Sequence, residues 1–322
     1  MNRPVNRKKI SIAAAILVSL ITAVVLVSFR DVTNEPSYQG KPLSKWLENF
    51  FKLEPPHDPP MPEAQIAIRS IGTNALPHLL RMFSGKDSGL KRWLCELDRR
   101  KSLLNLRFLR MHSAEAEHER AAAGFVTLAD IAEPVAPEVA RLAQDRTEVS
   151  ELAGTVLPYL GNNGMISAVS MLSSTNPVER ASMAFNLSGL VTTSQNENSC
   201  VVFSEGYRRR ASVIVIPALI KLLDDPDYRV VPCAAFTLGR LRTEPRIVVP
   251  ALTNLIQDAR VSQGSRIAAA QALGNFGAEA RVAVPLLKRL ADEDQGKMGT
   301  TAARVLKQIV GDSASKSKLE SN

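Results

Sequence analysis

Aromatic residues, cysteines and histidines are all scarce in this chain of 322 residues. Phenylalanine, tryptophan and tyrosine together make up 5% of the sequence, whereas hydrophobic residues as a whole make up 45%. This balance argues against an aromatic-rich β core and fits helices rich in alanine and leucine. Cys95, Cys200 and Cys233 have no metal-binding spacing, and three is an odd number for an exported domain held by disulfides. We expect Cys95 and Cys233 to pack inside helices and Cys200 to be more exposed; whether any two of them pair stays open.

Local signatures of catalysis and metal binding are also missing. The chain has no GxSxG, no HExxH and no glycine-rich phosphate loop, the local signatures of many hydrolases, zinc proteases and phosphate binders. Glu115 and His118 form one Glu-x-x-His pair, but di-iron bundles need a second such pair and further carboxylates, which the sequence lacks. We therefore expect an exposed, charged helix start at 112–119, and no metal, cofactor or catalytic residue.

A helical cassette recurs through most of the chain. The segment DPDYRVVPCAAFTLGRL is echoed about 35 residues later by GSRIAAAQALGNF. Leu238-Gly239 matches Leu273-Gly274, and Leu306 follows in the same phase, so the separations are 35 and 33 residues. Weaker copies upstream centre on Leu187, on Leu157 with Leu160, on Leu128 with Ile131, and on Ile71 with Gly72. Such a period is the signature of an array of repeated units.

Two longer gaps between the copies indicate insertions. Leu187 and Leu238 are 51 residues apart, which leaves about 18 residues beyond a 33-residue period. The polar stretch TTSQNENS accounts for them. Ile71 and Leu128 are 57 residues apart, which indicates an extra helix over Leu90–Arg110.

Each cassette predicts two helices. Apolar residues return every three or four positions, and alanines stand where two helices must approach closely. One proline in each cassette fits the first turns of the second helix, where amide groups have no acceptor within the helix. These prolines are Pro217, Pro250 and Pro285. The triplet Asp225-Pro226-Asp227 predicts a turn and a helix cap before the next cassette.

The strings Ala234 to Leu241 and Ala269 to Phe276, each followed by a Val-Pro pair, resemble HEAT repeats. The resemblance is to the short bacterial HEAT-like repeats first associated with phycobilisome lyases, and it covers roughly residues 60 to 310. The recurring tryptophan of tetratricopeptide repeats and the TPLH signature of ankyrin repeats are absent. The resemblance implies an all-α fold, a right-handed α-solenoid of helix pairs. It extends only to the type of repeat, so lyase activity is not carried over.

The amino end predicts a membrane anchor. Ile10 to Phe29 is a run of 20 residues without charge, long enough to cross a bilayer as a helix. Four cations precede it within residues 1–9, so the positive-inside rule places those residues in the cytoplasm and everything after Arg30 across the membrane. Two alternatives remain, a buried soluble helix and a cleaved signal peptide, and cleavage would make the protein secreted or periplasmic.

The net charge of +8 is unevenly distributed. Apart from the four cations near the amino end, positive charges cluster in residues 86–112 and at Arg208, Arg209 and Arg210. Such clusters can attract anionic lipid headgroups or an acidic protein, but they are also compatible with solvated helix faces. Because export would separate the repeats from chromosomal DNA, we do not expect nucleic acid as a partner.

Between the anchor and the repeats, the sequence predicts a short amphipathic helix that begins near Ser44, after an extended approach at Pro42. Its apolar face consists of Leu43, Trp46, Leu47, Phe50 and Phe51. The helix fits a cap over the first apolar face of the array, or alternatively a partner-binding helix on a tether. The predicted organisation is a cytoplasmic tail at 1–9, a transmembrane anchor at 10–29, a tether and capping helix at 30–60, a repeat solenoid at 61–310 and a disordered tail at 311–322.

Together these features predict a membrane-tethered scaffold that binds partner proteins, with an acidic partner as one option. We expect its working surface on the second helices. Their polar residues make a mildly basic row if all of them point inward: Arg81, Arg141, Lys221, Asn254, Lys288 and Arg289. The alternative is an envelope enzyme or cofactor lyase built on the same repeats, which would need a deep polar pocket near the insertions at 85–119 and 191–211.

Overall fold

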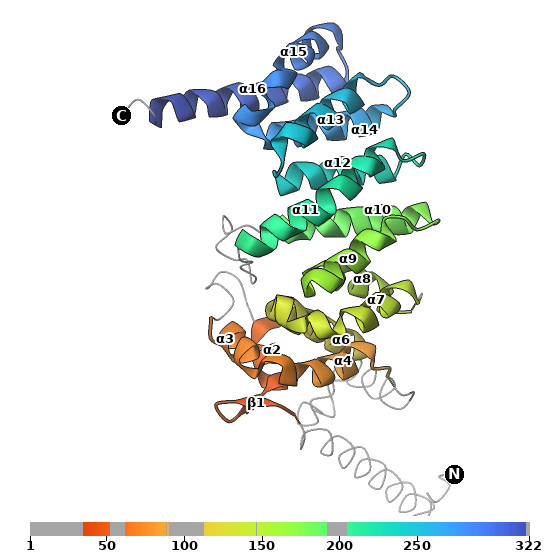
Figure 1. Cartoon of the computed structure of the whole chain (residues 1–322), viewed down its shortest axis with the longest axis vertical. Helices are drawn as coiled ribbons and strands as arrows, with labels where there is room; N and C mark the ends of the chain where they lie inside the picture. Colours follow the sequence, from red (N-terminus) through yellow and green to blue (C-terminus); the bar gives the residue numbers. More distant parts are fainter. Residues whose placement is uncertain are drawn as a thin grey trace, which may run out of the picture. The chain divides into compact units, whose positions relative to one another are not determined.

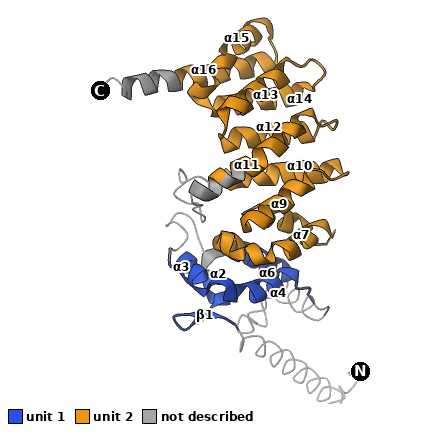
Figure 2. Cartoon of the chain, viewed as in Figure 1, with its two compact units in different colours: residues 1–55, 61–121 blue, residues 56–60, 122–322 orange. Residues whose placement is uncertain are grey.

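The computed structural model of the chain describes residues 35–51, 62–87, 89, 113–145, 147–191 and 205–319. Helices account for most of these residues, and the sheet found among them is a two-stranded hairpin (Figure 1). The chain divides into two compact units, residues 1–55 with 61–121 and residues 56–60 with 122–322 (Figure 2). The boundary falls inside helix α6 (Ala114–Leu128), within the region where the sequence predicts a continuous array.

Several predicted segments lie outside the described residues. They are the tail at 1–9, the anchor at 10–29, the helix at Leu90–Arg110 and the polar stretch TTSQNENS. Within the described part of the chain, no helix combines the length and the apolar character needed to cross a bilayer.

Among the described residues, the first unit contains a hairpin, three helices, one 3-10 turn and the start of α6. Its elements are β1 (Ser37–Tyr38), β2 (Lys41–Pro42), α2 (Leu43–Phe51), α3 (Pro62–Ile71), η1 (Gly72–Ala75) and α4 (Leu76–Ser84). Helix α2 begins one residue before Ser44, close to its predicted start, and it contacts α3. Leu43, Trp46 and Leu47 are buried, as their shared face predicts, whereas the Phe50 and Phe51 side chains lie outside the described residues.

The hairpin before α2 was not predicted, since the sequence suggested only an extended segment at Pro42. Gln39 and Gly40 both have positive φ angles, 51° and 73°, the backbone of the tight turns that join two antiparallel strands. The turn brings Lys41 over Trp46, with the Nζ atom 4.5 Å from the centroid of the indole ring. The ring of Tyr38 meets the same indole edge-on at a centroid distance of 6.3 Å. The hairpin therefore completes the packing around the buried tryptophan.

The second unit begins within α6 and contains the remaining helices. In order these are η3 (Ala129–Val135), α7 (Ala136–Gln144), α8 (Ser150–Val156), η4 (Leu157–Tyr159), α9 (Gly161–Met171), α10 (Pro177–Asn186), η5 (Leu187–Val191), α11 (Glu205–Lys221), η6 (Leu222–Asp224), α12 (Val230–Leu241), α13 (Pro245–Gln257), α14 (Gln263–Asn275), η7 (Gly277–Ala283), α15 (Val284–Glu293) and α16 (Lys297–Leu319).

These helices form pairs that repeat the same neighbours. The first helices of successive pairs contact one another in the order α8, α10, α12, α14 and α16. The second helices do likewise in the order α7, α9, α11 and α13, and α13 then contacts η7, which leads into α15. In Figure 1 the pairs of this unit follow one another in chain order from α7 to α16. The helix pairs that the cassettes predict are thus confirmed, and each packs on the pair before it.

A close approach between first helices explains the glycine of the repeated Leu-Gly. A Cβ atom on Gly239 would lie 2.6 Å from the Cα atom of Ala272 on α14. A Cβ atom on Gly274 would lie 3.4 Å from a methyl group of Val305 on α16. The leucine before each of these glycines is fully buried. The predicted phase therefore marks a close approach between first helices, in which Gly239 faces the backbone of α14 and Gly274 faces side chains of α16.

The prediction for the prolines is correct for only one of the three. Pro285 is the second residue of α15, but Pro250 is the sixth residue of α13 and Pro217 is the thirteenth of α11. Helix α13 starts earlier because Pro245 already occupies its first position, where a missing amide hydrogen costs nothing. Helix α11 starts earlier because it extends back into the predicted insertion at 191–211.

The carboxyl end also differs from the prediction. The sequence predicts a disordered tail at 311–322, whereas α16 continues to Leu319. This segment loses the apolar periodicity of the repeats but contains alanine, lysine and leucine and no proline. Its alanine, lysines and leucine favour a helix, whereas its glycine and three serines do not, and no proline interrupts it.

Candidate interaction surface

The six residues of the predicted basic row all occupy exposed positions on second helices. Arg81 lies on α4 in the first unit, and the other five lie in the second unit on α7, α11, α13 and α15. Five of the six follow an exposed proline by four residues. The pairs are Pro77 and Arg81, Pro137 and Arg141, Pro217 and Lys221, Pro250 and Asn254, and Pro285 and Arg289. Because residues four apart share a helix face, each of these helices presents the same combination of one apolar and one polar residue.

This pairing was not predicted from the sequence, where the prolines indicate only helix starts. On α9 the exposed residue Ile166 takes the place of the proline, and Ser170 lies four residues later. The signal that identifies the face is therefore an exposed apolar residue followed by a polar residue four positions on, once in every second helix. Lys288 lies one position outside this register, next to Arg289.

Ion pairs divide the row into two classes. Arg141 donates to Glu138 at 2.6 Å and to Asp145 at 2.5 Å. The hydrogen bond from Arg141 lowers the pKa of Glu138, and the same bond raises the pKa of Arg141. Within the described part of the chain, by contrast, no carboxylate lies within the 4.0 Å of an ion pair from Lys221, Lys288 or Arg289. Lys221, Lys288 and Arg289 are therefore without an ion-pair partner among the described residues, whereas the charge of Arg141 is compensated.

Exposed aliphatic residues and a groove lie on the second helices α11 and α13 and on η7, which precedes α15. Val213, Ile247 and Val282 are 65%, 49% and 70% exposed and are separated by 34 and 35 residues. An open groove of about 390 Å³ lies between α13 and η7. Its lining consists of Pro245, Arg246, Val249, Pro250, Glu279 and Val282. One cation and one carboxylate at the edge of an apolar groove suit a docked side chain better than a converging catalytic set.

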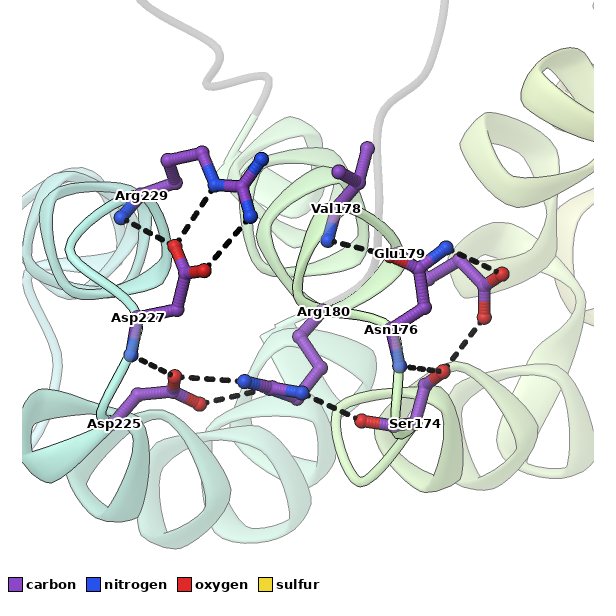
Figure 3. Close-up of polar contacts among 8 residues, drawn as sticks. All are labelled: Ser174, Asn176, Val178, Glu179, Arg180, Asp225, Asp227 and Arg229. Atoms are coloured by element: carbon purple, nitrogen blue, oxygen red, sulfur yellow. Dashed lines mark hydrogen bonds and ion pairs between the residues drawn. The ribbon is translucent and has the colours of Figure 1, made fainter.

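A polar network joins two successive turns in the second unit (Figure 3). The Arg180 guanidinium on α10 donates to both carboxylate oxygens of Asp225, each at 2.8 Å, and to the backbone oxygen of Ser174 at 2.8 Å. The Arg180 and Asp225 side chains are 13% and 6% exposed. Arg180 therefore holds these two turns together and does not face a partner.

The turn at Asp225 recurs after every second helix from α9 onward. In each copy a side-chain oxygen accepts a hydrogen bond from the backbone amide two residues later. The pairs, with the residue that donates its amide named first, are Asn176 and Ser174, Asp227 and Asp225, Arg260 and Asp258, and Gly296 and Asp294. The acceptors are 51, 33 and 36 residues apart, close to the spacings of the repeated leucines. The predicted turn at Asp225-Pro226-Asp227 is confirmed, and it is one copy of a motif shared by four turns. The helix cap predicted there is wrong, because the N-cap residue of α12 is Arg229 and no side chain caps this helix.

In two of these turns, an arginine that follows an aspartate by two residues binds the carboxylate of that aspartate. The Arg229 guanidinium donates to both oxygens of Asp227, at 2.9 and 2.7 Å. Arg260 makes the same bonds to Asp258, at 3.0 and 2.8 Å. These hydrogen bonds, supported by the backbone amide of the same arginine, lower the pKa of each carboxyl to about 2. The Asp-x-Arg spacing is a local structural device that the sequence analysis did not recognise.

His118 is buried, which corrects the prediction that this helix start is exposed. Its Nε2 atom lies 2.7 Å from the backbone oxygen of Gly85, and its ring meets Phe83 edge-on at a centroid distance of 6.4 Å. Glu115 of the suggested Glu-x-x-His pair is exposed. Among the described residues, no three histidine, cysteine or acidic side chains come together in a way that could hold a metal ion. His118 thus connects the end of α4 to α6 within the first unit.

The remaining candidate residues are only partly described. Cys233 lies in α12 as a half-buried free thiol, and burial raises its pKa, which makes it less reactive. Cys95 and Cys200 lie outside the described residues, as does most of the basic cluster at 86–112. Of the three arginines at 208–210, only the side chain of Arg209 is described, and it is exposed. The two insertions where an enzyme would need its pocket are likewise described only at their ends.

Comparison with known protein families connects this architecture to one class. Most of the described residues are helical, and the family model of the PBS lyase HEAT-like repeat matches residues 265–293. These residues comprise most of α14, all of η7 and all of α15, so the match covers one helix pair. It supports the HEAT-repeat resemblance that the repeated Leu-Gly strings suggested. A comparison with curated proteins finds no match.

Proposed function

We propose that this protein is a membrane-tethered scaffold whose HEAT-like helix pairs form a right-handed α-solenoid and bind partner proteins through the second helices. One observation carries the proposal: the second helices of the second unit present an exposed apolar residue followed, four positions on, by an exposed polar one. Buried positions recur in an array because each must fit the same neighbour. Exposed positions have no such constraint, so their regular recurrence indicates a surface that binds something.

The membrane tether rests on the amino-terminal sequence. A run of 20 uncharged residues from Ile10 to Phe29 follows four cations, the pattern of a signal anchor with a cytoplasmic amino end. The repeats then lie on the exported side, and cleavage of the segment would release them as a secreted or periplasmic protein. Tethering would confine partner binding to the membrane surface and raise the effective concentration of any partner held there.

A charge-reversal experiment tests the scaffold function. The variant Lys221→Glu with Lys288→Glu replaces two uncompensated cations, and Arg304→Glu with Lys307→Glu makes the same charge change on exposed residues of α16. Full-length protein would be crosslinked in native membranes and recovered by affinity capture. We expect the first variant to lose crosslinked partners and the control to retain them, with equal thermal unfolding of both. Equal recovery from the two variants would refute the assignment of the surface.

A further inference from the structure

We infer that the surface formed by α11, α13, η7 and α15 accepts an amphipathic α-helix that carries an acidic stripe beside an apolar one. The inference rests on the proposed function and names the chemistry of the partner. Two sets of exposed side chains on these elements, each called a strip below, carry it. The apolar strip consists of Val213, Pro217, Ile247, Pro250, Val282 and Pro285, and the basic strip consists of Lys221, Lys288 and Arg289 with Asn254 between them.

The spacing of the strips matches the dimensions of a helix. Lys221, Asn254 and Arg289 each follow the proline of their helix by four positions, a rise of about 6 Å along the helix axis, and Lys288 follows Pro285 by three. A helix about 10 to 12 Å wide that crosses the second helices would cover both strips at once. Packed helices lie about 8 to 10 Å apart, and residues seven apart on the crossing helix are about 10.5 Å apart. Every seventh residue of the partner would therefore meet the next repeat.

An extended peptide fits these strips less well. Successive side chains of a strand point to opposite faces, so only one row of them would face the surface and only one strip would be covered. A nucleic acid would satisfy the basic strip through its phosphates but would leave the exposed aliphatic residues in water. The pairing of an apolar strip with a basic one favours the helix, which presents both kinds of side chain on one side.

Charges around the surface define the orientation of the partner. Arg246 and Glu279 both line the groove, so the apolar side carries one cation and one carboxylate. Beyond the basic strip, exposed carboxylates follow at Asp224, Asp292 and Glu293. An acidic stripe is therefore attracted over Lys221, Lys288 and Arg289 and repelled one turn further on.

The groove supplies the site where an apolar side chain of the partner would anchor. Val249, Pro250 and Val282 line it, and the Val282 side chain is among the most exposed aliphatic residues of the described chain. A leucine-sized side chain of the partner would cover these atoms, which is the central contact expected of such an interface. The flanking cations would then decide the register of the helix and select an acidic sequence.

A designed peptide tests the inference directly. The probe is a fluorescent helical peptide of about 18 residues, with glutamate at every seventh position and leucines one turn away. Its binding to the full-length protein in detergent is followed by fluorescence anisotropy. We expect Lys221→Glu with Lys288→Glu to weaken binding by about tenfold or more, and Arg304→Glu with Lys307→Glu to leave it unchanged. A second peptide with lysine in place of each glutamate should prefer the charge-reversed protein.

Two further comparisons identify the occupant. Val282→Ser should weaken binding of the acidic peptide, whereas Val310→Ser, a change at another exposed valine on α16, should not. A version of the acidic peptide whose helix is interrupted by prolines should bind more weakly than the helical probe, and so should a DNA duplex. Equal binding by either competitor, or no exchange of preference between the two peptides, overturns the inference. If the peptides fail while crosslinked partners still depend on Lys221 and Lys288, the scaffold function stands and the helical partner is wrong.

Discussion

The two units of the molecule pack their helices with different residues. In the first unit, Trp46 is buried beneath the hairpin, and His118 binds the backbone oxygen of Gly85. In the second unit, first helices approach through small residues, as where Gly239 lies against Ala272. A contact that recurs in every repeat can use the same small residues each time, but the face at the start of an array has no earlier copy to cover it. Bulky side chains that occur once perform that task.

The difference also explains why tryptophan is so rare in this chain. An array fills its interior by bringing backbones together, so it needs few large side chains. The first unit instead packs a short helix and a hairpin around Trp46, one of the 2 tryptophans of the sequence. The following variants test whether the two regions depend on these different contacts, from the largest expected effect to the smallest.

Trp46→Ala should have the largest effect, confined to the first unit. Removing a buried tryptophan from a packed site costs about 3 to 5 kcal/mol of unfolding free energy. We expect hydrogen exchange to accelerate in α2 and α3 while protection in α12 and α14 is retained. Ile66→Ala, at an exposed position of α3, serves as the control and should leave exchange nearly unchanged. Uniform loss of protection through both units would show that they unfold as one.

Gly239→Val should destabilise the second unit. The new side chain would begin 2.6 Å from the backbone of Ala272, so α12 and α14 must separate, at a cost of about 1 to 3 kcal/mol. Urea unfolding followed by circular dichroism measures the change. Gly264→Ala is the matched control, because its new methyl group has its nearest neighbour at 3.9 Å, a serine hydroxyl. A stability equal to that of the control would mean that the repeated glycine is not a packing requirement.

How far the sequence predicted these features depends on whether they repeat. The helix pairs and the phase of Leu238 and Leu273 were predictable because each copy reinforces the others. The hairpin at Gln39 and Gly40 occurs once, and glutamine is not among the residues typical of that turn. The burial of His118 was also unpredictable, since its partner is a backbone oxygen 33 residues away.

The candidate interaction surface was likewise predictable from the sequence only in part. The sequence identified six polar residues on second helices, and the structure places all six at exposed positions. It did not reveal that Arg141 is compensated by Glu138 on its own helix and by Asp145 at the end of that helix, although the spacing of these residues was visible in the sequence. The groove lined by Pro245 and Val282 depends on how neighbouring pairs pack, which no local pattern encodes.

Arg180→Met should lower the stability of the protein more than the loss of an exposed ion pair does. The substitution leaves the largely buried carboxylate of Asp225 without its bidentate partner. Arg229→Met removes an arginine from the more exposed pair with Asp227 and should have a smaller effect. Thermal unfolding of the two variants gives the comparison, and a double variant with Asp225→Asn measures the coupling. Equal midpoints for Arg180→Met and Arg229→Met would contradict a special role for the buried network.

Arg260→Ala should have the smallest effect on stability and a clear effect on titration. The pKa of Asp258 is about 2 in the folded protein, against an ordinary value of 3.8, chiefly because of hydrogen bonds from the Arg260 side chain and amide. A carboxyl whose pKa falls on folding adds stability above its ordinary pKa, and that contribution is lost as the pH drops from about 4 to about 2.

The variant keeps the backbone amide of residue 260, so the pKa of Asp258 should rise only part of the way toward its ordinary value. Carbon NMR titration of the aspartate carboxyl groups measures this, with Asp227 as the internal reference because its own arginine is intact. Arg229→Ala should give the reciprocal result. Since Arg260 is almost fully exposed, unfolding at neutral pH should barely change. If Asp258 titrates as before, its low pKa comes from the turn backbone alone, and the arginine of the Asp-x-Arg spacing has some other role.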